Sequence, residues 1–416
     1  KIPCLTTTCT HRHGTCQIRR NKKSVLFDSA RTQILDLFDA NRSSYLASFN
    51  LVHFRKPVIM LPAIVRSLWL SSSSVSHTHR LPGLALGACV VRTLCTPHGH
   101  GDPDVHRHSV KYVVEQCEKR LAEQNIPEPD LSARHMMAHI LNGKSLHHVH
   151  SRQKTILTDA QLQEYRKMTE RRLERTPVPY IIGEWDFRYL TLSLRPPVLI
   201  PRPETEELVQ HVLQDLKTIP TSSCPRGDEV SDTDSSADTE SLHCLDIGCG
   251  SGAISLSLLH ECPEVSVSAV DINTAAVDLT RHNAARLNLD NRLDVVHCSA
   301  AELAERFPAQ MFDVVVSNPP YIPTGDMPGL EKELNYEDQF ALDGGEDGLD
   351  VVKDILACSA HLLKPGRSLW LEVDSRQPPV IEEYVAKHPD CNLEWLASHT
   401  DFQERPRFCH LRRRWS

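Results

Sequence analysis

Residues 242–252 read LHCLDIGCGSG: an apolar segment, an acid, and three glycines at alternate positions. A helical pattern over 253–260 follows at once. This order predicts a buried strand, a tight turn and a helix, because glycine lets a backbone turn sharply and approach a ligand without a Cβ clash. The acid precedes the first glycine, so the spacing differs from the Gly-x-Gly-x-x-Gly of dinucleotide-binding loops. The stretch therefore predicts a ligand loop at the edge of an α/β sheet.

The acid in this loop indicates which ligand it binds. Asp246 would repel a pyrophosphate but can reach the amino-acid end of S-adenosylmethionine, the cofactor that we predict. The next strand, 265–270, ends in Asp271, which can accept both ribose hydroxyls; capping the helix over 274–287 is its alternative role. The predicted cofactor-binding residues are Asp246, Gly248, Cys249, Gly250, Ser251, Gly252, Asp271 and Asn318.

The rest of the C-terminal half continues the alternation of strand and helix. The predicted elements are strands over 293–297, 312–317 and 369–373, a helix over 351–363, and a final antiparallel pair over 393–397 and 407–411. Alternating elements imply a doubly wound, largely parallel α/β sheet. Ligands bind at the carboxyl ends of such strands, where Asp246, Asp271 and Asn318 would all lie.

Residues 312–321 read FDVVVSNPPY, a strand that runs directly into an Asn-Pro-Pro-Tyr loop. Prolines fix φ and lack an N–H, so the carbonyls of this loop are held rigidly and stay free to accept. The Asn318 oxygen and one such carbonyl can accept both hydrogens of an NH2 group and aim its lone pair at a methyl carbon, while Tyr321 can stack on a planar target. The predicted catalytic residues are Asn318, Pro319, Pro320 and Tyr321. Taken alone, the loop could be a turn with an apolar flank.

A small helical domain is predicted over 106–178, before the sheet domain over 179–416. Residues 110–121, 131–141 and 159–175 show helical spacing of apolar residues, and Asp159 is the candidate cap of the last helix. Such a unit carries no chemistry of its own, and a substrate-docking role and a plain structural role are both open.

Three further segments precede the glycine loop. Residues 180–194 are predicted to be rich in β-structure, and 206–216 to be helical. Residues 221–241 are crowded with Ser, Thr, Asp and Glu and have almost no large apolar residue, so we expect a disordered insertion.

The N-terminal extension, 1–105, contains a candidate targeting segment. Residues 60–101 have no Asp or Glu and carry three arginines among six serines, which is typical of a mitochondrial transit peptide and predicts a matrix protein. A secretory signal around 84–91 and a disordered tail without an address are the alternatives. The apolar runs are shorter than the about 20 residues of a transmembrane helix, so no membrane partner is expected. Residues 1–59 show no usable pattern.

Composition limits the class of protein further. The 416 residues allow two or three domains, and the formal charge of −8 without a basic stripe argues against a stable nucleic-acid partner. The 14 cysteines include no Cys-x-x-Cys pair, so we expect reduced and mostly buried thiols. His135 and His139 lie one helical turn apart without an acidic or cysteine partner, so no metal is predicted.

Several blocks of the chain resemble the HemK/PrmC family of peptide chain release factor glutamine methyltransferases. They are YIIGE at 180–184, LIPRPETE at 199–206, the glycine loop, SNPPYI at 317–322 and DGGEDGL at 343–349. The resemblance, from about Val110 to Phe408, implies a class I S-adenosylmethionine-dependent methyltransferase fold, Rossmann-like with a seven-stranded mixed sheet. It implies methyl transfer to the side-chain amide nitrogen of the glutamine in a release factor's Gly-Gly-Gln motif. It also implies that the helical domain docks the release factor, which in mitochondrial members is a mitochondrial one.

The substrate contacts are less well determined by sequence. The predicted substrate-binding residues are Asn318, Pro319, Tyr321, Arg202 and Glu204. Arg202, Glu204 and Thr205 could shape the substrate channel or cap the next helix. Members of the family often carry an acidic-aromatic pair after the third strand, where this chain has Ser299 and Ala300, so the adenine contact stays open.

Two rival functions remain. A DNA adenine-N6 methyltransferase would present the same planar NH2 to the loop, but it must extrude its base and usually needs a basic recognition surface. A catalytically silent methyltransferase-like subunit is the other, against which the intact glycine loop, Asp271 and Asn318 argue. No oligomeric state is predicted.

Overall fold

The computed structural model describes residues 107–143, 145–219 and 241–415. All of them fall within one compact unit, Gly83–Ser416. The predicted leader and, apart from Ser241, the predicted disordered insertion lie outside the described residues, so both stay predictions.

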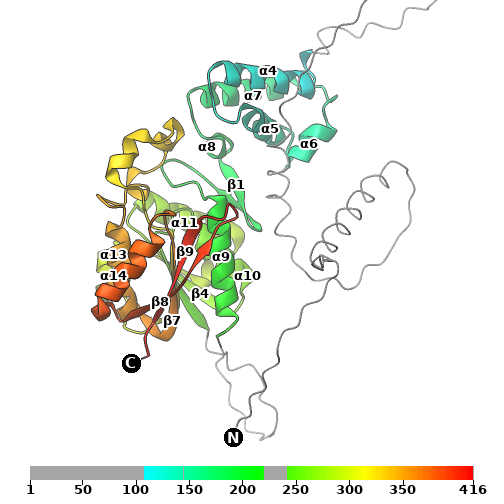
Figure 1. The fold of residues 1–416 in the computed structure, drawn as a ribbon. Coiled ribbons are helices and arrows are strands. Elements are labelled where there is room, and N and C mark those ends of the chain that lie inside the picture. Colours follow the sequence, from blue (N-terminus) through cyan, green and yellow to red (C-terminus); the bar gives the residue numbers. More distant parts are fainter. Residues whose placement is uncertain (1–106, 144, 220–240, 416) are drawn as a thin grey trace, which may run out of the picture. The chain divides into compact units, whose positions relative to one another are not determined.

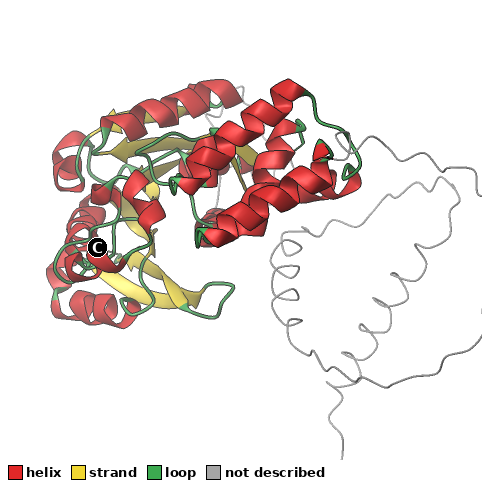
Figure 2. Cartoon of the chain, turned by 90° about the horizontal axis from the view of Figure 1, so that it is seen from above, coloured by secondary structure: helices red, strands yellow, loops and turns green. Residues whose placement is uncertain are grey.

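The first described part is a bundle of helices (Figures 1 and 2). They are α4 (Val110–Glu123), α5 (Pro129–Ile140), α6 (Leu146–Ser151), α7 (Asp159–Leu173) and α8 (Val178–Ile182). The apolar stripes predicted for α4 and α7 do face a common core, in which Leu121, Met136 and Tyr165 are fully buried. The sequence pattern does not predict α6, because half of its residues are histidines and only Val149 is buried.

The cap of α7 differs from the predicted one. Thr158, not Asp159, is the N-cap: its hydroxyl accepts from the Gln161 backbone N–H, and the Gln161 side chain accepts from the backbone N–H of Thr158. This reciprocal capping box leaves Asp159 in the first turn, where its carboxylate meets the positive end of the helix dipole.

The segment predicted to be rich in β-structure, 180–194, begins instead in helix α8. A two-stranded hairpin, β1 (Glu184–Phe187) and β2 (Leu190–Ser193), follows. Pro179 lies in the first turn of α8, where proline is tolerated, and Gly183 ends the helix with a φ of 83°. The predicted boundary between the two domains, after residue 178, therefore falls at the start of α8.

A seven-stranded mixed sheet forms the core of the C-terminal part, as predicted. Its strands are β3 (Leu242–Ile247), β4 (Val265–Asp271), β5 (Leu293–His297), β6 (Phe312–Ser317), β7 (Leu363–Glu372), β8 (Leu393–Thr400) and β9 (Pro406–Arg413). They lie in the order β5-β4-β3-β6-β7-β9-β8; the first five are parallel, and β9 pairs antiparallel with both β7 and β8. The chain moves outward from β3 and returns beside it as β6, so the switch point between these strands is the expected ligand site.

Helices cover both faces of this sheet, with α9 and α10 on one side and α13 and α14 on the other (Figure 1). The helices are α9 (Pro203–Leu216), α10 (Ala253–Glu261), α11 (Thr274–Leu287), α12 (Leu303–Arg306), α13 (Asp350–Leu362) and α14 (Pro378–Lys387). Successive residues of β3 pack on opposite faces of the sheet. Cys244 packs in the cluster with α9 and α10, and Leu245 packs in the cluster with α13 and α14. Short 3-10 turns occur at Asp290–Arg292, Ala300–Glu302, Thr324–Gly329, Lys332–Tyr336, Gln339–Ala341 and Pro389–Cys391.

The cysteines of the described residues are all free, and every one except Cys262 is buried. For this part of the chain, the expectation of reduced and mostly buried thiols is confirmed. No helix within the described ranges has the length and apolar character needed to cross a bilayer.

Three histidines stack with a tryptophan between α9 and strands β7, β8 and β9. The His410 ring lies 3.9 Å from that of Trp370, and the His211 ring lies 4.7 Å from His399 and 5.3 Å from Trp370. Burial lowers the pKa of His211 and of His410 to about 4, and it also lowers the pKa of His399. The folded state therefore favours neutral imidazoles in this stack.

We expect the histidine stack to destabilise the fold in acid. The unfolded chain, with ordinary histidine pKa values near 6.5, binds more protons than the folded chain between about pH 6.5 and about pH 4, so the free energy of unfolding falls through that window. Buried Asp246 and Glu372, whose pKa values are raised to about 7, act in the opposite direction. Denaturant titration of wild type and His211→Phe isolates the effect: the variant should lose less stability on acidification, and an equal loss would contradict it.

Candidate active site

The predicted site residues meet at the carboxyl ends of three neighbouring strands. Asp246 is the next-to-last residue of β3, Asp271 is the last residue of β4, and Asn318 directly follows β6. In the sheet β3 lies between β4 and β6. The Ser317 hydroxyl donates to the Ile247 carbonyl at 2.6 Å, which ties the end of β6 to the end of β3. Residues far apart in sequence therefore converge at the switch point.

The glycine loop has the conformation that its glycines were expected to allow. Gly248, Gly250 and Gly252 have φ values of 77°, 57° and 83°, a region that favours glycine. A Cβ built on Gly250 would meet nothing within 4 Å, so this part of the loop faces open space. The Cys249 and Ser251 side chains are buried, so of these two residues only the backbone is placed to contact a ligand.

Asp246 carries a buried oxygen without a partner. Its Oδ2 accepts from the Ser255 backbone N–H at 3.1 Å and from the Ser255 hydroxyl, whereas Oδ1 has no hydrogen-bond partner. Burial raises the pKa of this carboxyl to about 7, against the effect of the two bonds from Ser255. An unpaired buried carboxylate oxygen is costly, and a bound cation at this position would relieve that cost.

Asp271 supports the glycine loop from the end of β4. Its Oδ2 accepts from the Gly250 N–H at 2.9 Å, and its Oδ1 accepts from the Asn273 N–H at 2.8 Å. The alternative that Asp271 caps α11 is wrong, because the N-cap is Asn273, whose side chain accepts from the Ala275 N–H. Each carboxylate oxygen retains a further lone pair for a ligand.

Ile272, the next residue, was missed by the sequence-based prediction. It is a large apolar side chain with 62% of its surface exposed beside Asp271. The signal that could have identified it is its position immediately after an acid at the end of a strand.

The Asn-Pro-Pro-Tyr loop holds the amide of Asn318 in one orientation. Its Nδ2 donates to the Thr205 hydroxyl oxygen at 3.0 Å, and the Thr205 hydroxyl donates to Oε2 of Glu372 at 2.8 Å. Within the described part of the chain, nothing donates to Oδ1 of Asn318 or to the carbonyls of Pro319 and Pro320. The loop therefore presents acceptor oxygens without internal partners, as the prolines led us to expect.

The DGGEDGL block packs against the backbone of the Asn-Pro-Pro-Tyr loop. A Cβ on Gly344 would come within 2.7 Å of the Pro320 carbonyl oxygen, and a Cβ on Gly348 would overlap the Tyr321 carbonyl oxygen. Gln377 donates to the carbonyls of Tyr321 and Gly348, each at 3.0 Å. Glycine is thus needed at 344 and 348 because two backbone segments touch there.

We expect Gly348→Ala to damage this contact. Gly348 has a φ of 73°, where an L-residue is strained by about 1–2 kcal/mol, and its new Cβ would also press on the Tyr321 carbonyl. We expect a lower melting temperature and a turnover rate about tenfold lower, since displacing a loop that is predicted to position the substrate is costly. Gly329→Ala is the matched control, because a Cβ there meets nothing within 4 Å. Equal melting temperatures and rates for the two variants would contradict the packing role.

The PRPETE block lies beside the Asn-Pro-Pro-Tyr loop, and its side chains make no capping bond to α9. Arg202 occupies the N-cap position without a capping side-chain bond. Instead its Nη2 lies 2.6 and 2.8 Å from the two carboxylate oxygens of buried Glu337, and Glu204 lies 3.5 Å from Arg405. The Thr205 hydroxyl accepts from Nδ2 of Asn318, as described above. The capping alternative for these residues is therefore wrong.

Glu372 is the other functional candidate that the sequence-based prediction missed. It is fully buried at the end of β7, in a strand otherwise composed of large apolar residues at this point. A charged residue in a run such as LWLEV was the available signal. No cluster of three or more His, Cys, Asp or Glu side chains suited to a metal occurs among the residues that the structure describes.

Two known domain families match the chain. The PrmC N-terminal domain matches residues 113–183, and the Methyltransferase small domain matches residues 234–329. The human MTRF1L release factor glutamine methyltransferase is 43% identical over 297 residues, which cover 70% of this chain and 83% of the relative. This chain belongs to the release factor glutamine methyltransferase family. The resemblance inferred from the motifs is thereby confirmed.

Two further relatives are less similar to this chain than the human one. The Bifunctional methyltransferase of Rickettsia prowazekii (strain Madrid E) is 32% identical over 306 residues, covering 73% of this chain but 57% of the relative, so the chain spans little more than half of that protein. A solved protein-(glutamine-N5) methyltransferase (release factor-specific) from Alicyclobacillus acidocaldarius is 24% identical, covers 52% of this chain and 94% of its own, and gives a TM-score of 0.31. A score this low adds nothing to the match in sequence.

Proposed function

We propose that this family member transfers a methyl group from S-adenosyl-L-methionine to the side-chain amide nitrogen of the glutamine in the Gly-Gly-Gln motif of a peptide chain release factor. The observation that carries the proposal is the orientation of Asn318. Its amide N–H bonds inward to Thr205, which leaves its oxygen directed away from that bond and available to accept. Such an oxygen beside proline-fixed carbonyls fits the NH2 of a primary amide.

The residues around the glycine loop fit S-adenosylmethionine. The unpartnered Oδ1 of Asp246 suits the ammonium of its amino-acid end, and the spare lone pairs of Asp271 suit the ribose hydroxyls. The exposed side chain of Ile272 suits one face of the adenine. When bound, this cofactor supplies a methyl carbon that its sulfonium makes electrophilic.

The catalytic loop would act by orientation and hydrogen bonding. The oxygen of Asn318 and the Pro319 carbonyl accept the two amide hydrogens, which draws electron density to an otherwise weakly nucleophilic nitrogen and fixes its lone pair. Burial raises the pKa of Tyr321 to about 12, so its hydroxyl stays protonated. Its ring would stack on the planar amide. The nitrogen gains the methyl group and releases one proton to solvent.

The partner and the compartment form part of the same proposal. Residues 106–178 would dock the release factor, and Arg202 and Glu204, at the start of α9, would line its approach. The acid-free segment 60–101 supports delivery to the mitochondrial matrix.

Mass spectrometry of the product tests the reaction. After incubation of the full chain with a release factor and the cofactor, the peptide that contains Gly-Gly-Gln should gain the mass of one methyl group on its glutamine. A methyl group on another residue of the factor, with that glutamine unmodified, would contradict the proposal.

Imaging tests the compartment. A fusion that begins at Met60 should colocalise with mitochondria. Diffuse cytosolic signal would overturn the matrix assignment without affecting the proposed reaction.

A further inference from the structure

An asparagine amide is useful in this reaction only in one of its two orientations. Its oxygen and nitrogen have nearly the same shape, yet only the oxygen can accept a hydrogen from the substrate NH2. A flipped Asn318 would place its own NH2 against that of the glutamine, donor against donor. Some feature of the fold must therefore favour the productive orientation.

The hydrogen bonds that run from Asn318 through Thr205 to Glu372 favour the productive orientation. Glu372 is fully buried, and as a carboxylate it can only accept. The Thr205 hydroxyl donates its single proton to Glu372 at 2.8 Å. Toward Asn318 the same hydroxyl can therefore only accept, and it accepts from Nδ2 at 3.0 Å. The oxygen of the amide is thereby turned away from Thr205.

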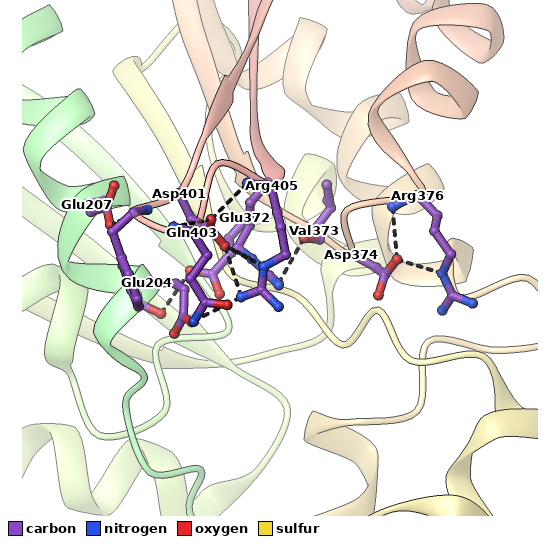
Figure 3. A network of polar contacts seen from close by, with 12 residues as sticks. Glu204, Glu207, Glu372, Val373, Asp374, Arg376, Asp401, Gln403 and Arg405 are labelled. Atoms are coloured by element: carbon purple, nitrogen blue, oxygen red, sulfur yellow. Dashed lines mark hydrogen bonds and ion pairs between the residues drawn. The ribbon is translucent and has the colours of Figure 1, made fainter. Parts of the chain in front are cut away.

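Glu372 and Thr205 are buried among other polar residues of the fold. Both are less than 5% exposed. Figure 3 shows Glu372 among residues from the turn between β8 and β9 and from α9. That turn is fixed by a bond from the Phe402 N–H to Glu207 at 3.0 Å and by Asp401, which accepts from Arg405 and Arg407. The turn between β8 and β9 thus holds the surroundings of Glu372 in place.

We propose that Thr205 and Glu372 are positioning residues for methyl transfer, which fix the Asn318 amide with its oxygen toward the substrate nitrogen. This inference rests on the proposed function. Neither residue needs to touch the substrate, because each acts through Asn318. Hydrogen bonds in such a chain also polarise one another, so the Glu372 charge increases the acceptor strength of the Asn318 oxygen.

The polarity of the chain depends on the ionisation of Glu372. Burial raises the pKa of Glu372 to about 7, and the charge of Glu204 adds to that rise. The bond from Thr205 and the nearby charges of Arg407 and Arg202 oppose it. Burial and, to a lesser extent, the charge of Glu372 raise the pKa of Tyr321 to about 12, so its hydroxyl remains neutral. Below this pKa, a protonated Glu372 can donate to Thr205 and remove the preference for one orientation. With saturating cofactor, kcat should therefore fall on acidification.

The experiment measures single-turnover methylation of a release factor by the full chain at about pH 8, where Glu372 is ionised. Thr205→Val keeps the shape but removes the hydroxyl, and we expect a rate at least about tenfold lower with unchanged cofactor affinity. Thr205→Ser restores the hydroxyl and should recover most of the rate. Glu372→Gln keeps the volume but can donate as well as accept, so its rate should be lower and insensitive to pH between about 6 and 8.

A second set of variants removes the difference between the two orientations of the side chain at position 318. In Asn318→Asp both outer atoms of the side chain are oxygens, so Thr205→Val should cost less in this background than in the Asn318 enzyme. Equal losses in both backgrounds, a Ser variant as slow as the Val variant, or an unchanged rate in Thr205→Val would each overturn the positioning role. Failure of the wild type to label any release factor would overturn the proposed function, and the positioning role with it. Melting temperatures and cofactor binding of each variant identify those that fail to fold.

Discussion

Replacing Asn318 by alanine should lower kcat by about three orders of magnitude. In the proposed mechanism the variant removes the side-chain acceptor of the substrate NH2, and loss of one preorganised partner of this kind typically costs about 10²–10³ in kcat. A thousandfold loss corresponds to about 4 kcal/mol of transition-state stabilisation. The affinity for S-adenosylmethionine should change by less than about threefold, because the proposed cofactor contacts are made mainly by the glycine loop, Asp246 and Asp271. Rapid-quench assays and calorimetry measure the two quantities.

The control for this prediction is Asn291→Ala, an exposed asparagine in a 3-10 turn away from the carboxyl edge of β3, β4 and β6. It should leave turnover and cofactor binding as in the wild type. A kcat for Asn318→Ala within about tenfold of the wild type would remove the side chain from the mechanism, since that effect is too small for a direct transition-state contact. A parallel loss of cofactor binding would instead assign Asn318 to the cofactor site.

Asp246→Asn should weaken S-adenosylmethionine binding by about 100-fold. In the proposed site the wild-type carboxylate would pair with the ammonium of the cofactor, and leaving a buried charge without its partner costs about 2–5 kcal/mol. The substitution should not destabilise the empty protein. Burial raises the pKa of Asp246 to about 7, which means that its charge opposes folding at higher pH.

The pH dependence of binding provides an internal check. As pH falls below about 7, Asp246 takes up a proton and wild-type affinity should fall by up to about tenfold per pH unit, whereas Asp246→Asn should lack this acid limb. Affinity should also fall above about pH 8 in both proteins, where an ordinary α-amino group loses its proton. As a matched ligand, 5′-methylthioadenosine has no amino-acid end, so its affinity should be the same for both proteins. Equal weakening of both ligands would contradict the proposed contact.

The sheet domain could be predicted closely from sequence because its strands are buried and bounded by clear signals. The predicted limits of the strands over 293–297 and 312–317 agree with those of β5 and β6. Both are apolar segments that follow turns, and tertiary packing reinforces their local preference. The glycine loop, Asp246 and Asp271 follow from the same logic, since chemistry at the end of a parallel strand faces the ligand edge.

Other features depended on contacts that no local pattern reveals. The bond from Thr205 to Glu372 joins residues 167 positions apart. The pairing of Arg202 with Glu337 spans 135 positions, so the sequence alone left channel lining and helix capping equally open. Local errors arose where two short signals competed: Pro179 and Gly183 permit one helical turn within a segment whose aromatic and β-branched residues indicated strand.

Glutamine methylation by this chain is tested most directly by a comparison of three substrates. The full chain and labelled S-adenosylmethionine are incubated with a mitochondrial release factor, with the same factor whose Gly-Gly-Gln glutamine is replaced, and with duplex DNA. Glutamine methylation predicts label on the intact factor alone. Label on the DNA would favour an adenine methyltransferase, and binding of the cofactor without label on any substrate would indicate a silent subunit or a missing partner. Either result would contradict glutamine methylation by this chain acting alone.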